Sequence, residues 1–332
     1  MNARLFVLLQ ILFVFLASYA QDEKLGSSWH FDAKFLSNRK AAKEKLLKEG
    51  FTEVSFRSIN NLKLVGLLRE KKDASYTIIF SHGLCHYKEI FAPFVKLAPE
   101  NCNLFFFDMR GAGGSEGPNF TSKSISYGKT DYQDIVHAIQ FVNKKTSGKP
   151  IIVFGWCSGA FSCARAVIHL ENDLEKLNVK GLIFDSGFGS VLEMTHVPPL
   201  HLKHRFIPGC ILKLYGGNRE KAKQSYLCKL SVLFLLSCFH TLFLFLKPSI
   251  AKREPETNLY DKARNIKVPM FAIHCEDDYY TPWQSIEKLV KNIGQKDVWL
   301  IEAGRSQHAK NHIKLKEEYQ QNLHRWLQST IS

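Results

Sequence analysis

The sequence predicts an α/β fold, in which a mostly parallel sheet is covered by helices on both faces. Two observations carry this prediction: short apolar runs alternate with helical patterns along most of the chain, and two alternating apolar–polar segments precede them. Parallel strands need a crossover between them, and crossover helices pack on the faces of the sheet. At 332 residues, the chain is long enough for one such domain with an insertion.

The elements follow one another in a regular order. A charged stretch at residues 35–50 favours a helix, and alternating segments at residues 53–57 and 62–68 flank Asn60-Asn61 and predict a β-hairpin. The later strands are expected at residues 76–81, 103–108, 151–154, 179–185, 270–274 and 298–301. The helices that cover them are expected at residues 87–97, 131–144, from residue 158 onward, and at 285–293 and 313–327.

Two segments stand outside this rhythm. Residues 1–20 have the apolar stretch and small-residue end of a secretory signal peptide, with an uncleaved anchor as the alternative. The α/β core is expected at residues 21–190 and 266–332, with a cap insertion at 191–265 between them. The apolar segment 230–246 of the cap is short for a membrane span, and a span there would separate the two halves of the core. We expect segment 230–246 to form a buried cap helix or a lid that contacts lipid. The signal-like residues 1–20 predict a protein that is secreted or resides in the lumen of the secretory or endolysosomal pathway.

Charge and cysteine content exclude several functions. The formal net charge of +14 is spread along the chain without interleaved aromatic residues, so nucleic-acid binding is not expected, although contact with an anionic membrane surface is compatible with it. The eight cysteines lack metal-ligand spacing, and a secretory route would permit one or two disulfides at most. Asn119 begins an Asn-Phe-Thr sequon in an expected surface loop, which predicts glycosylation.

The most informative motif is residues 155–160, which follow the strand at 151–154. The spacing matches a strand–nucleophile–helix elbow, with Gly155 and Gly159 placed where a side chain would clash in the sharp turn. Cys157 occupies the position that serine usually holds. Ser158 is the alternative nucleophile, but it would put Trp156 where the turn needs the smallest side chain. A third reading makes Cys157 an ordinary small core residue.

A nucleophile at an elbow needs a histidine to take its proton and a carboxylate to orient that histidine. Asp278 is the preferred acid because it follows the strand at 270–274 and stands four residues before Pro282, and Asp277 is the second choice. His308 lies in the loop after the last strand and completes the order nucleophile, acid, histidine. His312, one helical turn later, is expected to face outward.

Donors for an oxyanion are expected at two backbone positions. Gly83 follows the strand at 76–81 and lets the chain turn toward the nucleophile, so that the N–H groups of Leu84 and Ser158 form the oxyanion hole. The glycine-rich residues 108–115 lack the spacing of a dinucleotide fingerprint. They are expected to form a tight loop that braces the oxyanion turn.

Taken in order, His82-Gly83, the loop at 108–115, the elbow, Asp278 and His308 resemble the α/β-hydrolase superfamily. The likeness is to monoacylglycerol-lipase-like hydrolases and related serine peptidases, and it implies an α/β-hydrolase fold with a cap insertion after the sixth strand. Two residues depart from the family pattern. Cys157 replaces serine, as in dienelactone hydrolases and polyester synthases, and Cys275 replaces the glycine that usually follows the histidine of that strand.

The sequence therefore predicts a hydrolase that cleaves an ester, thioester or lactone of an apolar, lipid-like acyl group through Cys157, His308 and Asp278. The N-terminus of the following helix favours the thiolate of Cys157. A thiolate also leaves a tetrahedral adduct readily, which makes amide cleavage less favourable. The alternatives are a serine-peptidase-like activity and an inactive hydrolase-fold protein that binds a lipid or a partner. No metal or organic cofactor is implied.

Overall fold

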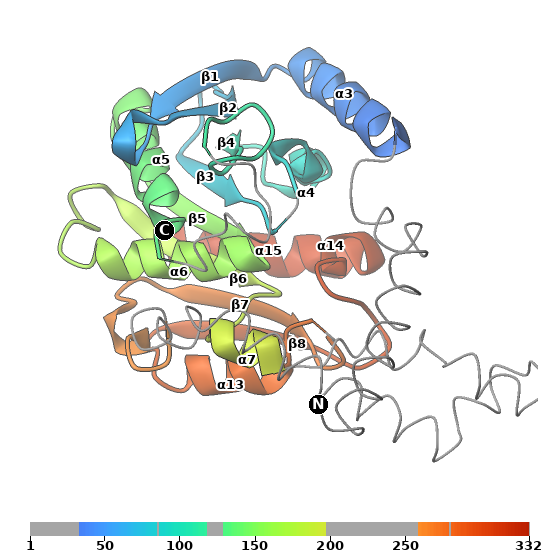
Figure 1. Ribbon diagram of the computed structural model, residues 1–332, viewed down its shortest axis with the longest axis vertical. Coiled ribbons are helices and arrows are strands. Elements are labelled where there is room, and N and C mark those ends of the chain that lie inside the picture. Colours follow the sequence, from blue (N-terminus) through green and yellow to red (C-terminus); the bar gives the residue numbers. More distant parts are fainter. Residues whose placement is uncertain (1–32, 85, 118–128, 197–257, 279, 332) are drawn as a thin grey trace, which may run out of the picture. The chain divides into compact units, whose positions relative to one another are not determined.

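The computed structural model describes residues 33–84, 86–117, 129–196, 258–278 and 280–331 (Figure 1). The chain divides into two compact units, Met1–Glu49 and Gly50–Ser332. The first contains helix α3 (Ala33–Lys48), as predicted, and the second contains the sheet and the candidate site. The expected signal peptide and the apolar segment 230–246 lie outside the described residues, as does most of the expected cap.

The described residues of the second unit form one eight-stranded sheet in the order β1-β2-β4-β3-β5-β6-β7-β8. The first two strands pair antiparallel, β2 pairs antiparallel with β4, and all later pairings are parallel. The strands are β1 (Thr52–Arg57), β2 (Lys63–Arg69), β3 (Tyr76–Ser81), β4 (Cys102–Phe107), β5 (Ile151–Trp156), β6 (Val179–Asp185), β7 (Met270–Cys275) and β8 (Lys296–Ile301). The predicted hairpin and the mostly parallel sheet are both confirmed.

The helices agree with the sequence prediction except at two places. The helix expected at 87–97 consists of two short pieces, because Pro93 has no N–H and can begin a helix but not continue one. The helix expected at 313–327 is also divided, since Leu315 is not helical. The helical elements that the structure describes in this unit are η1 (Ile59–Asn61), η2 (Lys88–Phe91), α4 (Phe94–Leu97), α5 (Tyr132–Lys145), α6 (Ser158–His169), α7 (Val191–His196), η3 (Ala263–Asn265), α13 (Trp283–Val290), α14 (Asn311–Lys314) and α15 (Lys316–Ile331). None of the described helices has both the length and the apolar character needed to cross a bilayer.

The two faces of the sheet bury different sets of side chains. Successive strand residues point to opposite faces, so Ile79 and Val153 join the core of aliphatic and aromatic side chains beneath α5 and α6. Phe80 and Phe154 point the other way and meet the aromatic rings of η2 and α4, with Phe80 and Phe154 centroids 4.7 Å apart. Both faces are thereby closed to water. The polar side chains of a site are therefore expected beyond the carboxyl ends of the parallel strands, where α/β folds bind their ligands.

Candidate active site

Cys157 lies in a strained turn between the end of β5 and the start of α6. Its φ of 56° and ψ of −122° are unusual for a residue with a side chain, and its side chain is only partly buried. A Cβ on Gly155 would lie 2.3 Å from Ala160 Cα, and one on Gly159 would lie 2.3 Å from the carbonyl oxygen of Ser81. The two glycines therefore permit the close approach of strand and helix that the sharp turn requires.

The elbow is held by backbone hydrogen bonds on both sides of Cys157. The Cys157 N–H donates to the carbonyl of Asp185 at 3.0 Å, and the Cys157 carbonyl accepts from Ala160 N–H at 3.0 Å. Ser158, the alternative nucleophile, is the first residue of α6 and does not occupy the strained position. Its N–H has no helical carbonyl to bond, because the first turn of any helix lacks such partners.

The turn after β3 lies directly against the elbow. A Cβ on Gly83 would be 2.9 Å from Cys157 Cβ and 3.5 Å from its Sγ. Leu84 follows Gly83 and is 39% exposed, and its N–H donates to none of the described residues. The turn that carries Leu84 and the first residue of α6, Ser158, thus both adjoin Cys157.

Residues 108–115 brace this turn, as predicted, through the buried ring of His82. The Met109 N–H donates to His82 Nε2 at 3.1 Å, which leaves the proton on Nδ1 to donate to the Gly83 carbonyl at 2.8 Å. Asp108 fixes the loop itself, because it accepts hydrogen bonds from the backbone N–H groups of Lys88 and Gly114 and from the Lys88 ammonium group. The position of Gly83 is therefore set by a buried polar network.

Asp278 lies in the turn after β7 and is 3% exposed. Its Oδ1 accepts from the N–H groups of Tyr280 and Thr281 at 2.9 and 3.0 Å, and its Oδ2 accepts from the Thr281 hydroxyl at 2.9 Å. Burial alone would raise the pKa of Asp278, but the charge of His308 and these hydrogen bonds bring it below the ordinary value. The carboxylate form is therefore favoured.

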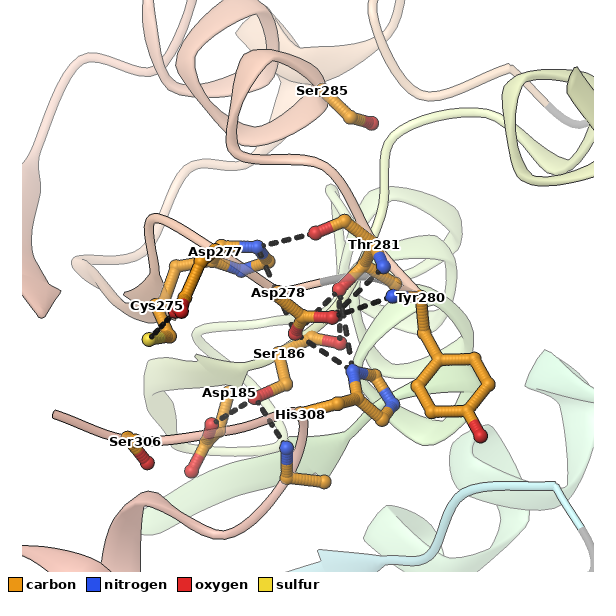
Figure 2. Close-up of polar contacts among 12 residues, drawn as sticks. Asp185, Ser186, Cys275, Asp277, Asp278, Tyr280, Thr281, Ser285, Ser306 and His308 are labelled. Carbon is orange, nitrogen blue, oxygen red and sulfur yellow. Dashed lines mark hydrogen bonds and ion pairs between the residues drawn. The ribbon is translucent and has the colours of Figure 1, made fainter. Parts of the chain in front are cut away.

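His308 lies in the loop between β8 and α14, where its side chain contacts Asp278. Figure 2 shows its Nδ1 pointing at Asp278, 2.7 Å from Oδ2, with the ring of Tyr280 beside it. Burial alone would lower the pKa of His308, but the charges of Asp278 and Cys157 and hydrogen bonds to both side chains raise it above the ordinary 6.5. The imidazole thus contacts the predicted acid through Nδ1 and lies within electrostatic reach of the predicted nucleophile.

The neighbouring acids have different positions. Asp277, the second choice, is exposed and accepts from Gly304 N–H at 2.9 Å and from the thiol of Cys275 at 2.9 Å. Glu276 is also exposed and accepts from Ala303 N–H. Both carboxylates brace the start of the histidine loop, and neither is hydrogen-bonded to His308.

The expectation for His312 is wrong. Its ring is 3% exposed, stacks on Phe94 with centroids 4.9 Å apart, and meets the edge of Trp156 at 5.1 Å. The cause is the division of the final helix: α14 is a separate turn that packs against the aromatic face of the sheet, so its side chains do not follow the outer face of α15.

Two buried residues near the site were missed in the sequence. Asp185 and Ser186 stand at the end of β6, both fully buried, and the Ser186 hydroxyl lies between the Asp185 carboxylate and the loop of His308 (Figure 2). The available signal was a polar pair directly after an apolar parallel strand, at the edge where ligands bind.

Some predicted residues cannot be placed. Asn119, the predicted glycosylation site, lies outside the described residues, as do Cys85 and the three cysteines at 210, 228 and 238. The four cysteines that the structure describes, Cys102, Cys157, Cys163 and Cys275, are unpaired.

Comparison with known proteins agrees with the observed fold. The family model of the alpha/beta hydrolase fold matches residues 76–206. No curated protein sequence matches the chain significantly. Among solved structures, the esterase Pf2001 of Pyrococcus furiosus is similar at 17% identity and a TM-score of 0.58, covering 85% of this chain and 91% of that one.

Two other solved structures are similar over most of their length. A bacterial membrane phospholipase A shares 16% identity at a TM-score of 0.58, covering 98% of this chain and 99% of that one. The proline iminopeptidase of Mycobacterium smegmatis shares 13% identity at a TM-score of 0.55, covering 84% and 99%. The chain has the α/β-hydrolase fold, with its eight-stranded, mostly parallel sheet among the described residues.

Proposed function

We propose that the protein hydrolyses a carboxylic ester, thioester or lactone of an apolar acyl group, with Cys157 as nucleophile, His308 as general acid and base, and Asp278 as the group that orients His308. The observation that carries this proposal is the position of the His308 ring, which is hydrogen-bonded to Asp278 at 2.7 Å and lies close enough to Cys157 for the charge of that residue to raise the pKa of the imidazole. The strained φ of Cys157 supports it, because such strain is typical of functional positions.

In the first half of the reaction, the thiolate of Cys157 attacks the acyl carbon and the C=O electron pair moves onto oxygen. The raised pKa of His308 supports a protonated imidazole beside the nucleophile. The N–H groups of Leu84 and Ser158 donate to the oxyanion, as preorganised donors do in acyl transfer. The adduct collapses as His308 Nε2–H gives its proton to the leaving oxygen or sulfur, which leaves a thioester on Cys157 and a neutral imidazole.

In the second half, a water molecule replaces the leaving group. Neutral His308 takes one proton from the water at Nε2, while the water oxygen attacks the thioester carbon. Collapse of this adduct breaks the carbon–sulfur bond, releases the carboxylic acid and restores the thiolate beside imidazolium. Asp278 keeps the Nδ1 proton in place throughout, so that Nε2 alone exchanges protons.

The leaving group decides between esters and amides. A thiolate is a better leaving group than an amine, so the adduct of an amide with Cys157 returns to reactants unless the nitrogen is protonated first. Esters, thioesters and activated lactones have less basic leaving groups than amides, so less proton transfer from His308 is needed before the bond to the leaving group breaks. The similar solved structures include both an esterase and a peptidase, and the cysteine favours the first of these chemistries for this chain.

The nature of the acyl group and the location of the protein are inferred from sequence. The apolar segment 230–246 belongs to the expected cap, which supports a lipid-like substrate and peripheral contact with a membrane. The signal-like residues 1–20 support a secreted or lumenal location.

The test is hydrolysis of p-nitrophenyl acyl esters of increasing chain length by the wild type, Cys157→Ala and Cys157→Ser. We expect the alanine variant to lose activity by about 10³-fold or more, since removal of a nucleophile leaves only binding and oxyanion stabilisation. Cys163→Ala is the matched control, because this thiol is fully buried in α6 and burial raises its pKa far above the ordinary value.

The outcomes separate the two functions weighed from the sequence. Activity that is lost in Cys157→Ala, retained in Cys163→Ala and abolished by iodoacetamide in the wild type supports a cysteine hydrolase. An inactive wild type with activity in Cys157→Ser would overturn the proposal, and would mean a hydrolase fold kept for binding with its nucleophile replaced.

A further inference from the structure

Asp185 and Ser186, at the end of β6, lie where three loops of the site meet. The Asp185 carbonyl accepts from Cys157 N–H at 3.0 Å. The Ser186 carbonyl lies 3.3 Å from the Thr281 hydroxyl, in the loop of Asp278, and the Ser186 hydroxyl accepts from Ala309 N–H at 3.1 Å, next to His308. One buried dipeptide therefore contacts the loops of all three predicted catalytic residues.

The carboxylate of Asp185 organises this junction as an anion. It accepts from the Ser186 hydroxyl at 2.8 Å, from Asn311 Nδ2 at 2.9 Å and from the Tyr319 hydroxyl at 2.9 Å. The Ser186 oxygen is occupied as an acceptor by Ala309 N–H, so its own proton is available to Asp185. Because all three partners donate, the carboxyl group needs no proton of its own.

This charge is unfavourable for the stability of the fold. Asp185 is fully buried, and among the described residues neither a lysine nor an arginine forms an ion pair with it. Burial raises the pKa of Asp185 to about 6, against the opposing effect of its hydrogen bonds and of His308. A buried charge without a cation is rare unless it serves a purpose.

The network fixes the histidine loop on both sides of His308. Asn311, held by Asp185, accepts from the Ser306 hydroxyl at 2.7 Å, and Ser186 holds Ala309. Ala309 and Ser186 have φ values of 56° and 53°, in the left-handed region that residues with side chains avoid. Such conformations persist where the surroundings determine them, and the hydrogen bond between these two residues is part of that determination.

We propose that Asp185 is a positioning residue, which acts through Ser186 and Asn311 to hold His308 with Nε2 facing Cys157. The proposal rests on the proposed function, because it assigns Asp185 a role in maintaining the Cys157–His308 pair. Asp185 touches neither the substrate nor the reacting atoms. Its effect is carried by the backbone at Ala309 and by the side chain of Asn311.

The test is the rate at which iodoacetamide alkylates Cys157 in the full-length protein, followed on the Cys157 peptide by mass spectrometry between pH 5 and 10. This rate reports the thiolate that His308 supports and needs no substrate. The variants are His308→Ala, Asp185→Asn and Ser186→Ala. Ser58→Ala is the matched control, because the Ser58 hydroxyl also donates to a fully buried aspartate, Asp134, at 2.6 Å.

We expect alkylation at pH 7 to slow by about tenfold or more in His308→Ala, with its midpoint moving toward the ~8.5 of an isolated thiol. Asp185→Asn and Ser186→Ala should slow it by about three- to tenfold and shift the midpoint in the same direction. Ester hydrolysis should lose kcat in parallel while KM stays unchanged. Ser58→Ala should remain within about twofold of the wild type, since losing a remote hydrogen bond costs only stability.

Each result bears on a different claim. If His308→Ala slows alkylation and Asp185→Asn and Ser186→Ala do not, the positioning role is wrong and the proposed function stands. If His308→Ala alkylates like the wild type, the Cys157–His308 pair itself is wrong. If Ser58→Ala slows alkylation as much as Ser186→Ala, the effect is general destabilisation and the positioning role fails. Should Asp185→Asn not fold, Ser186→Ala decides.

Discussion

The two edges of the candidate site are built by different means. The elbow edge, residues 81–84 and 155–159, is shaped by backbone sterics: two glycines allow strand, turn and helix to approach closely, and Cys157 takes a strained φ. The acid–histidine edge, residues 185–186, 278–281 and 306–311, is shaped by side-chain hydrogen bonds between loops that follow three different strands. Local geometry places the nucleophile, and a long-range polar network places the groups that serve it.

The sharpest test of this contrast is Asp278→Asn at the acid–histidine edge. An amide nitrogen at the position of Oδ2 cannot accept from His308 Nδ1–H, so the imidazole is left in the wrong tautomer. We expect kcat for ester hydrolysis to fall about 10³–10⁴-fold, as on loss of the orienting carboxylate in other triads. The measurement is steady-state hydrolysis, with folding checked by circular dichroism.

The matched control is the adjacent carboxylate. Asp277 accepts only from Gly304 N–H and the Cys275 thiol in the described structure, and it is not hydrogen-bonded to His308. Asp277→Asn should leave kcat within about threefold of the wild type, the size of effect expected from an exposed hydrogen bond. Equal losses in the two variants would mean that the wrong acid had been assigned.

This contrast also explains what the sequence could and could not reveal. The elbow was predictable because its determinants lie within six consecutive residues, and each glycine has a steric reason that can be stated without a structure. Asp278 and His308 were predictable only from chain order and from their positions after strands. Asp185 and Ser186 could not be assigned, because their partners Asn311 and Tyr319 are more than 120 residues away along the chain.

The error at His312 has the same origin. The sequence prediction placed His312 at the start of a single helix at 313–327 and expected its side chain to face outward with the exposed side of that helix. The chain instead breaks at Leu315, with φ −125° and ψ 48°, so that α14 turns its histidine onto Phe94 and Trp156. Tertiary packing determines the orientation of the His312 side chain, and the helical periodicity of the sequence does not predict this orientation.

A substitution at the elbow tests the steric side of the comparison. In Gly159→Ala, the new methyl group would lie 2.3 Å from the Ser81 carbonyl oxygen and 2.6 Å from that of His82, both backbone atoms with little room to move. We expect a loss of about 1–3 kcal/mol in the free energy of unfolding, typical of overpacking, together with loss of ester hydrolysis. Urea unfolding and a hydrolysis assay measure the two effects.

Gly294→Ala provides the control for this substitution. No atom lies within 4 Å of a Cβ at Gly294, and its φ is not in the left-handed region. Its unfolding free energy should stay the same or rise by about 0.4–1 kcal/mol, because alanine restricts the unfolded chain. A Gly159→Ala protein as stable and active as Gly294→Ala would contradict the steric account of the elbow.

The buried titratable groups of the acid–histidine edge predict that stability falls in two steps as pH rises. The folded-state pKa of Asp185 is raised to about 6 from 3.8, so its contribution to stability is present below pH 3.8 and is lost as pH rises through 6. Each unit of pKa difference is worth about 1.4 kcal/mol, so the loss is on the order of 3 kcal/mol. The folded-state pKa of His308 is raised to about 10, so its contribution is present below pH 6.5 and is lost as pH rises through 10.

The measurement compares urea unfolding of the wild type and Asp185→Asn between pH 4 and 8. Asparagine does not titrate, so the wild type should lose stability relative to the variant as pH rises, most steeply between the unfolded and folded pKa values of Asp185 and little above the folded value. His308 is present in both proteins and cancels in the difference. A difference that keeps changing at the same slope up to pH 8 would mean that Asp185 remains protonated, and its proposed role as an anion would be wrong.

The smallest effect is expected at Cys275, at the end of β7. The thiol is buried at the end of β7 and donates to Asp277, which is itself exposed to water and also bound by Gly304 N–H. Cys275→Ala therefore removes one hydrogen bond to a carboxylate that water can solvate instead, and it should lower the unfolding free energy by about 1 kcal/mol. Because neither partner is hydrogen-bonded to His308, kcat should stay within about twofold of the wild type, and Cys275→Ser, which keeps a donor, should match the wild type more closely. A tenfold loss of kcat in the alanine variant would mean that the acid loop depends on this thiol, and the acid–histidine edge would then extend beyond the network centred on Asp185.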